Sequence, residues 1–155
     1  MSVRTGIGID SHRFEIGRRL MLGGVEVPHE HGLAGHSDAD VLVHAIVDAL
    51  LGAAGLGDIG EHYPDTDPAW RDADSLELLR EVVARVRAEG FAIEHVDATV
   101  MAEAPRLAPH RAAIRDSLGA VVGSVSVKAT TGERMGFVGR GEGIAALAVA
   151  TLSGG

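Results

Sequence analysis

The sequence predicts an α/β domain in which helices pack on a sheet, and three features favour this class. Segments with strand-like alternation of apolar residues are interleaved with segments of helical period. Hydrophobic residues make up 46% of the 155 residues, enough for a buried core, and aromatic residues make up only 3%, so this core must be aliphatic. No repeat or linker interrupts the chain. We therefore expect a single domain over residues 1–155.

Cap and turn residues divide the first half of the chain into elements. Ser37 precedes a long apolar run and has Asp40 three residues further on, which is typical of a helix start. The region before it is rich in Gly, His and Pro and favours irregular structure. In order, we expect a strand over residues 3–9, irregular structure over 11–37 with a short hairpin around 20–27, and a helix from Ser37 to about Ala54.

The second half is divided in the same way. Asp74 and Glu77 resemble a capping pair, and Gly90 closes the helix that follows them. Two later segments alternate apolar and polar residues as half-buried strands do. In order, we expect a loop over 58–74, a helix from Asp74 to Gly90, a strand over 93–101, a loop and helix over 105–118, a strand over 124–130, a glycine-rich segment over 132–143 and a last helix over 144–152.

Charge and composition exclude several classes of function. The net charge of -8 argues against nucleic acid as a partner, because affinity for nucleic acid depends on Lys and Arg. The chain has no cysteine, so any zinc must be held by His and carboxylate side chains. The N-terminus does not resemble a signal peptide, and no apolar run approaches the roughly 18 residues of a membrane span. We expect a cytoplasmic protein without a membrane partner.

Three side chains are candidate ligands of one divalent metal ion. Asp10 and His12 are two residues apart, so an extended backbone places both on the same side. His44 lies in a segment, Val41 to Gly57, whose only polar side chains are His44 and Asp48. A helix that is apolar nearly all round is buried, and a buried imidazole needs a partner. Asp10, His12 and His44 together supply three N/O ligands, which is the arrangement of a catalytic zinc site with an open position.

Each part of this hypothesis has a simpler alternative. Asp10 can merely orient His12 or cap a turn. His44 and Asp48, at positions i and i+4, can form a satisfied pair within the core.

Two further segments suit a phosphorylated ligand. His36 lies just before the expected helix start, beside free backbone N–H groups, although it can equally be a solvated loop residue. Thr130, Thr131 and Glu133 follow a strand within glycine-rich backbone; the hydroxyls can bind phosphate and the carboxylate can bind Mg²⁺. The alternative for this second segment is a turn with surface charges. The loop around Asp58 and Asp65 can hold the hydroxyls of a polyol, or it can simply be solvated.

These segments together resemble one family over the whole chain, the 2-C-methyl-D-erythritol 2,4-cyclodiphosphate synthases of the non-mevalonate isoprenoid (terpenoid) pathway. Each motif is modest alone, but their order and spacing are highly specific. The motifs are Gly6–Phe14, His36–Asp40 with His44, Gly57–Gly60, Pro64–Pro68, Ala104–Arg106, Lys128–Thr131 and Gly136–Gly143.

The resemblance implies a homotrimer of α/β (α+β) subunits, each with a four-stranded mixed sheet covered by helices on one face, and active sites between neighbouring subunits. It implies a phosphorus–oxygen lyase that converts 4-diphosphocytidyl-2-C-methyl-D-erythritol 2-phosphate to the 2,4-cyclodiphosphate and CMP. The competing hypotheses are a metal-dependent phosphoesterase and a non-catalytic trimer that binds nucleotides or isoprenoid diphosphates.

Carried over by position, the resemblance also implies residue roles. Asp10, His12 and His44 hold one zinc ion per subunit, and Glu133 contacts a second cation, Mg²⁺ or Mn²⁺, at the diphosphate. His36 and Thr131 stabilise the transition state. The substrate-binding set is Asp10, His12, His36, Ser37, Asp58, Ile59, Gly60, Tyr63, Asp65, Asp67, Ala102, Ala104, Pro105, Arg106, Leu107, Ala108, Thr130, Thr131, Glu133, Phe137 and Arg140. Within it, Ala102 to Ala108 form a cytidine pocket on the adjacent subunit.

Overall fold

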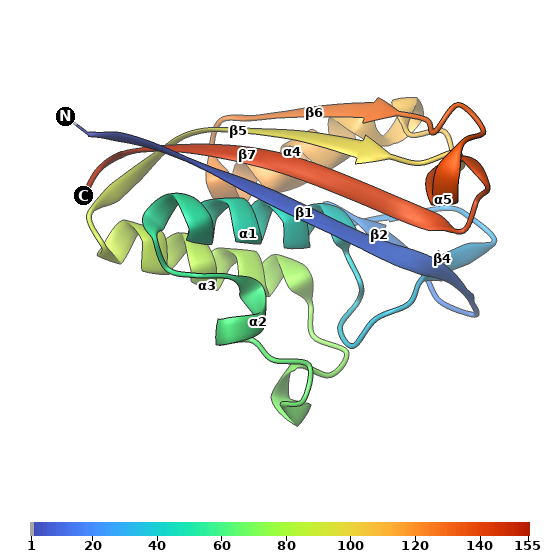
Figure 1. Cartoon of the computed structure of the whole chain (residues 1–155), viewed down its shortest axis with the longest axis horizontal. Coiled ribbons are helices and arrows are strands. Elements are labelled where there is room, and N and C mark those ends of the chain that lie inside the picture. The colour runs from blue at the N-terminus through green and yellow to red at the C-terminus, as the bar shows by residue number, and fades with distance from the viewer. Residues whose placement is uncertain (1) are drawn as a thin grey trace.

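The computed structural model describes residues 2–155, and in this part of the chain a five-stranded sheet carries helices on one face (Figure 1). The strands lie in the order β4-β1-β7-β5-β6, and β2 and β3 form a separate hairpin. The elements are β1 (Val3–Ile16), β2 (Leu20–Leu22), β3 (Val25–Val27), β4 (His31–Leu33), α1 (Val41–Ala54), α2 (Ile59–His62), α3 (Ser75–Ala88), β5 (Phe91–Met101), α4 (Arg111–Val122), β6 (Val125–Thr130), α5 (Gly136–Gly139) and β7 (Gly143–Gly154), with short turns of 3-10 helix at Pro68–Trp70 and Ala108–His110.

The α/β (α+β) class and the mixed sheet are confirmed. β1 runs antiparallel to β4 and β7, β5 runs antiparallel to β7, and β5 and β6 are parallel. The expected number of strands is wrong by one, because β4 pairs with the end of β1 through Phe14 and Leu33. β4 lies in the region expected to be irregular, since three residues are too few to show strand alternation.

The predicted helix over residues 144–152 is wrong, because this segment lies in the strand β7. β7 is the central strand of the sheet and pairs with β1 and β5 along its whole length (Figure 1). Most of its residues are buried, including consecutive ones. A strand that is covered by neighbours shows a continuous apolar run instead of alternation, and its many alanines add to the resemblance to a helix.

Two glycines of β1 bring this strand into close contact with α1. A Cβ atom at Gly6 would lie 2.1 Å from the carbonyl oxygen of Ala49, and one at Gly8 would lie 1.8 Å from that of Ala45. Only glycine therefore permits this approach of helix to strand. The contact places the first turns of α1 beside the segment of β1 that carries Asp10 and His12.

The start of α1 differs from the prediction. Its N-cap is Asp40 and not Ser37, so the helix begins at Val41. The buried carboxylate of Asp40 accepts hydrogen bonds from the backbone N–H groups of Val43, Gly23 and Gly24, at 3.1, 2.9 and 2.7 Å. Asp40 thus fastens the start of α1 to the turn between β2 and β3. Burial raises the pKa of Asp40 to about 6, although the three donors oppose the shift.

We predict that Asp40→Ala lowers the free energy of unfolding by about 2 kcal/mol, because a helix cap is lost and buried donors lose their acceptor. The pKa of Asp40 is about 6 in the folded protein and 3.8 in the unfolded chain. Protonation of Asp40 therefore stabilises the fold fully below pH 3.8, and this stabilisation is lost as the pH rises through about 6. The destabilisation should therefore be larger at about pH 5 than at about pH 7.5. Urea unfolding of the metal-free protein measures both values.

Asp74→Ala is the matched control. Asp74 caps α3 at an exposed position, where it accepts from the N–H of Leu76. Its loss should cost about 1 kcal/mol. An Asp40→Ala protein as stable as the parent chain at about pH 5 would contradict the cap assignment.

Candidate metal centre and substrate pocket

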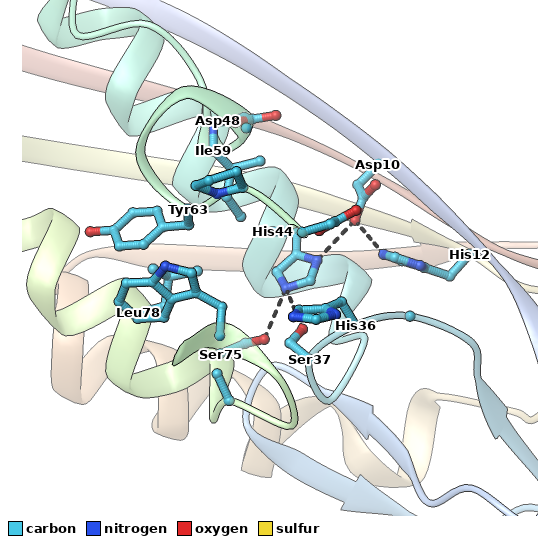
Figure 2. A pocket seen from close by; sticks show the side chains of 16 residues that line it. Asp10, His12, His36, Ser37, His44, Asp48, Ile59, Tyr63, Ser75 and Leu78 are labelled. Atoms are coloured by element: carbon cyan, nitrogen blue, oxygen red, sulfur yellow. Dashed lines mark hydrogen bonds and ion pairs between the residues drawn. The ribbon is translucent and has the colours of Figure 1, made fainter. Parts of the chain in front are cut away.

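A pocket of about 540 Å³ opens between the N-terminal part of α1 and the loops that flank it (Figure 2). β1, α1, α2 and the segments around residues 36 and 75 all contribute side chains. The pocket is lined by Asp10, His12, Gly35, His36, Ser37, His44, Asp48, Ile59, Gly60, Tyr63, Pro64, Asp65, Trp70, Ala73, Ser75 and Leu78.

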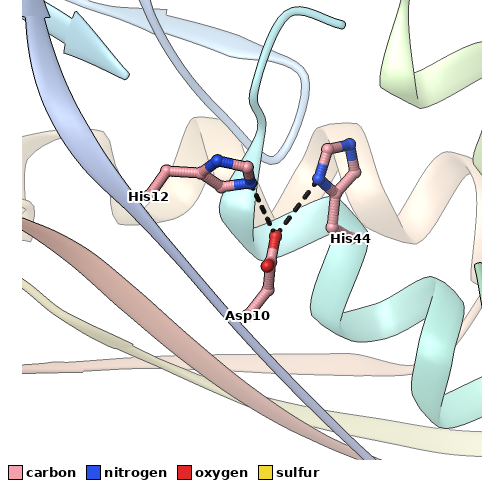
Figure 3. Close-up of side chains that lie close together, drawn as sticks. All are labelled: Asp10, His12 and His44. Carbon is pink, nitrogen blue, oxygen red and sulfur yellow. Dashed lines mark hydrogen bonds and ion pairs between the residues drawn. The ribbon is translucent and has the colours of Figure 1, made fainter. Parts of the chain in front are cut away.

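The structure brings the three predicted metal ligands together at the wall of this pocket (Figure 3). Asp10 and His12 project from β1, and His44 projects from α1. One carboxylate oxygen of Asp10, Oδ2, lies 2.8 Å from Nε2 of His12 and 3.2 Å from Nδ1 of His44. One ligand atom from each residue lies within 4.8 Å of the other two, so the group can hold a single metal ion.

The ring nitrogens that face away from Asp10 have partners of their own. Nδ1 of His12 lies 2.8 Å from the carbonyl oxygen of Ala34, which can only accept. Nε2 of His44 donates to Oγ of Ser75 at 2.9 Å, and Ser75 in turn donates to the carboxylate of Asp38. Such contacts fix the ring orientation and the tautomer of metal-binding histidines, and they leave Nε2 of His12 and Nδ1 of His44 for a metal.

The electrostatics of the metal-free triad agree with this assignment. Burial opposes ionisation of Asp10, but hydrogen bonds from His12 and His44 outweigh it and lower the pKa of Asp10 to about 2. Burial also opposes protonation of His12, and the adjacent Asp10 outweighs it and raises the pKa of His12. Both nitrogens of His12 face acceptors, so a divalent cation can take the place of a proton at Nε2. The donor set therefore fits a divalent metal.

Asp48 is not the partner of His44. Its carboxylate accepts a hydrogen bond from the N–H of Ile59 at 2.8 Å and so ties the start of α2 to α1. The satisfied core pair of His44 and Asp48, which the sequence left open, is therefore not formed, and His44 contacts Asp10, Ser75 and Ser37 instead.

The other residues expected around the metal divide into two groups. His36, Ser37, Ile59, Gly60, Tyr63 and Asp65 line the same pocket as the triad. Asp58 and Asp67 lie outside its lining, where each caps a helical turn through Oδ1, by accepting from the N–H of Glu61 and of Ala69. Neither cap uses Oδ2 of the carboxylate.

Most of the residues expected to bind cytidine, all but Ala104, gather in a second pocket of about 190 Å³. This pocket shares no residue with the first. Ala104, Glu133, Phe137 and Arg140 line neither pocket, and Arg140 forms an ion pair with Glu142 at 2.8 Å. The second pocket is lined by Ala102, Glu103, Pro105, Arg106, Leu107, Ala108, Arg111, Ala129, Thr130 and Thr131.

Several site residues were missed from the sequence. Ser75 directly follows a predicted helix cap and carried no other signal, yet its hydroxyl orients His44. Trp70 and Leu78 line the first pocket from segments that were expected only as a loop and as a helix. Glu103 accepts hydrogen bonds from the N–H groups of Gly132 and Arg134, and thereby holds the loop that carries Glu133. None of these contacts follows from spacing along the chain.

Fold and site together define an α+β protein with three N/O side chains, able to hold a metal ion, at the wall of an open pocket. A sequence profile of the YgbB family matches residues 3–153. The chain belongs to this family.

Curated relatives and solved structures agree with this family assignment. The 2-C-methyl-D-erythritol 2,4-cyclodiphosphate synthase of Symbiobacterium thermophilum is 59% identical over 153 residues, which cover 96% of this chain and 98% of that protein. The bifunctional IspDF of Campylobacter jejuni superposes with a TM-score of 0.95 at 44% identity, covering 99% of this chain and 43% of the longer one. A CDP-bound 2C-methyl-D-erythritol-2,4-cyclodiphosphate synthase gives a TM-score of 0.89 at 40% identity, covering 97% and 100% of the two chains.

Within residues 2–155, none of the helices has the length and apolar character needed to cross a membrane.

We predict that His44→Ala abolishes stoichiometric zinc binding, because two remaining ligands cannot hold the ion in an open site. Calorimetric titration of the metal-stripped protein measures the stoichiometry. His110→Ala is the control, since His110 belongs to the turn Ala108–His110 and lines neither pocket. One equivalent of tightly bound zinc in His44→Ala would refute the ligand assignment.

Proposed function

We propose that this chain is a metal-dependent cyclodiphosphate synthase and a phosphorus–oxygen lyase. It converts 4-diphosphocytidyl-2-C-methyl-D-erythritol 2-phosphate to 2-C-methyl-D-erythritol 2,4-cyclodiphosphate with release of CMP, a step of isoprenoid precursor synthesis in the cytoplasm. The observation that carries the proposal is the convergence of Asp10, His12 and His44 in one pocket with His36 and Ser37, in a member of the YgbB family.

The reaction suits a chain of this composition. The 2-phosphate of the substrate forms a bond to the β-phosphorus, and the bond from that phosphorus to the oxygen of CMP breaks. The attack is intramolecular, so holding the two phosphates in line supplies much of the rate, and no protein nucleophile is needed. Attacking and leaving groups are both anionic, and an acidic chain of net charge -8 must gather positive charge at this point.

Asp10, His12 and His44 would hold zinc, and Glu133 would hold Mg²⁺ or Mn²⁺ at the diphosphate. When bound, these ions supply Lewis acid stabilisation of the charge on the phosphoryl oxygens. His36 and Thr131 donate to the same oxygens as their charge increases. The placement of His36 beside the triad and of Thr131 in the second pocket supports these roles.

The two pockets suit the two ends of the substrate. Ser37, Ile59, Gly60, Tyr63 and Asp65 would hold the erythritol phosphate part, and Oδ2 of Asp58 and Asp67 would accept its hydroxyls. The second pocket would hold cytidine through residues 102–108 and Thr130, and Phe137 and Arg140 would complete the site. A solved relative described as CDP-bound supports a cytidine nucleotide as the ligand.

The complete site would lie between subunits of a homotrimer, with one zinc per subunit. Two observations support this assembly. First, the two pockets share no residue within one chain, so a substrate that needs both fits better across two chains. Second, the sheet face opposite the helices exposes apolar side chains, with Val3, Ile7 and Ile9 at 66%, 61% and 62% exposure. Association would bury this face.

Phosphorus NMR of the product tests the proposal. The metal-loaded protein is incubated with the cytidyl substrate in water enriched in oxygen-18. We predict a cyclic diphosphate and CMP in equal amounts, neither containing oxygen from the solvent. A linear phosphate that carries oxygen-18 would show attack by water, as in a phosphoesterase, and would refute the synthase.

We also predict that Glu133→Gln lowers turnover most when Mg²⁺ or Mn²⁺ is scarce, because the amide binds a hard cation more weakly than the carboxylate. Initial rates over a range of Mg²⁺ concentrations measure the effect. Glu77→Gln, an exposed substitution on α3, is the control. If Glu133→Gln and the parent chain depend on Mg²⁺ in the same way, Glu133 does not hold this cation.

A further inference from the structure

The segment that carries His36 and Ser37 is held through its backbone carbonyl groups. Residues 34–37 connect β4 to the start of α1, and all four carbonyl oxygens accept hydrogen bonds from outside the segment. The side chain of His12 donates to Ala34 at 2.8 Å, and the N–H of Asp72 donates to His36 at 2.9 Å. The other two carbonyls, those of Gly35 and Ser37, share a single donor residue.

That donor is Arg18, in the loop between β1 and β2. Nη1 of Arg18 donates to the carbonyl of Gly35 at 2.8 Å, and Nη2 donates to that of Ser37 at 2.6 Å. The two carbonyls flank His36, so the planar guanidinium spans the residue in the manner of a fork. Gly17 precedes Arg18 with a φ of 84°, a conformation that favours glycine and turns the chain toward the segment.

Arg18 is oriented for this contact. Its side chain is 26% exposed, and its nearest carboxylate, that of Glu15, lies 3.8 Å away. The neighbouring Arg19 differs: it is 75% exposed and faces Glu26 at 3.9 Å. The two adjacent arginines therefore form a natural pair of test and control.

We propose that Arg18 is a positioning residue for the phosphoryl transfer, acting through the segment 35–37 and not through the substrate. By bridging the carbonyls on either side of His36, it holds the backbone from which the His36 imidazole lines the pocket and from which the Ser37 hydroxyl lies 3.3 Å from Nε2 of His44 (Figure 2). Catalysis by a positioned donor is sensitive to small displacements, so loss of this restraint slows the chemical step. The role in turnover rests on the proposed function; the restraint on the segment does not.

The experiment compares Arg18→Ala, Arg18→Lys and Arg19→Ala in the full metal-loaded chain. Hydrogen exchange, followed by mass spectrometry, reports on residues 34–38 without any assay of activity. Arg18→Ala should exchange about tenfold faster in this segment, because the two hydrogen bonds from the guanidinium to backbone carbonyls are lost, while Arg19→Ala should match the parent chain. Arg18→Lys should lie between them, since an ammonium group cannot span both carbonyls in the same plane.

Turnover provides the second readout. Arg18→Ala should lower kcat about tenfold, with a smaller change in KM and with zinc stoichiometry unchanged. Added guanidinium ion should restore part of kcat in Arg18→Ala and none in Arg19→Ala, a rescue that a general loss of stability would not show.

If Arg18→Ala leaves the hydrogen exchange of residues 34–38 unchanged, Arg18 does not restrain this segment. Faster exchange with unchanged kcat would overturn its catalytic role. If the parent chain forms no cyclic product, the proposed function fails, and the exchange data still decide whether Arg18 holds the segment.

Discussion

The site depends on one carboxylate oxygen, Oδ2 of Asp10, which lies within hydrogen-bonding distance of imidazole nitrogens from two different elements. His12 is close to Asp10 because both lie on one side of the same strand. His44 is close only because α1 approaches β1 as nearly as glycine allows, at Gly6 and Gly8. A side chain at either glycine would push the helix away from the strand and separate His44 from the other two ligands. Gly6 and Gly8 are therefore packing residues that bring the three candidate metal ligands together.

The surroundings of this oxygen favour a positive charge beside it, from a protonated imidazole or from a metal ion. Asp10 stays ionised because its pKa is about 2, and each histidine uses its second nitrogen to contact a fixed acceptor, so the inward nitrogens converge on one point. The chain carries a net charge of -8, so the positive charge that a phosphorylated ligand needs at the pocket would come from cations held there, with His36 beside them in the lining. One layer out, three side chains hold the backbone of a neighbouring loop: Arg18 donates to carbonyl groups, and Glu103 and Asp40 accept from N–H groups.

The sequence predicted the parts of the molecule that depend on local spacing. Asp10 and His12 followed from strand periodicity, Asp74 from its capping pattern, and His44 from a polar residue within an apolar helix. Features that depend on contacts between distant segments were not predictable in this way. β7 was assigned to a helix because its nearly continuous run of apolar residues, four of them alanine, lacks the alternation of a half-buried strand. Ser37 was expected as the cap of α1 in place of Asp40. The turn at Gly23 and Gly24, which completes the hydrogen bonds of Asp40, lies far away in sequence and gave no local signal. Ser75 and Arg18 likewise show no motif, since the fold brings their partners to them from distant segments.

The measurement that tests the central claim most directly is anomalous diffraction at the zinc absorption edge from crystals of the zinc-loaded protein. A single ion should appear at the wall of the first pocket, bound by a carboxylate oxygen of Asp10, by Nε2 of His12 and by Nδ1 of His44, at about 2.0–2.2 Å, with its remaining position open to the pocket. An ion held elsewhere, a closed site with a fourth protein ligand, or coordination of His12 through Nδ1 would contradict it.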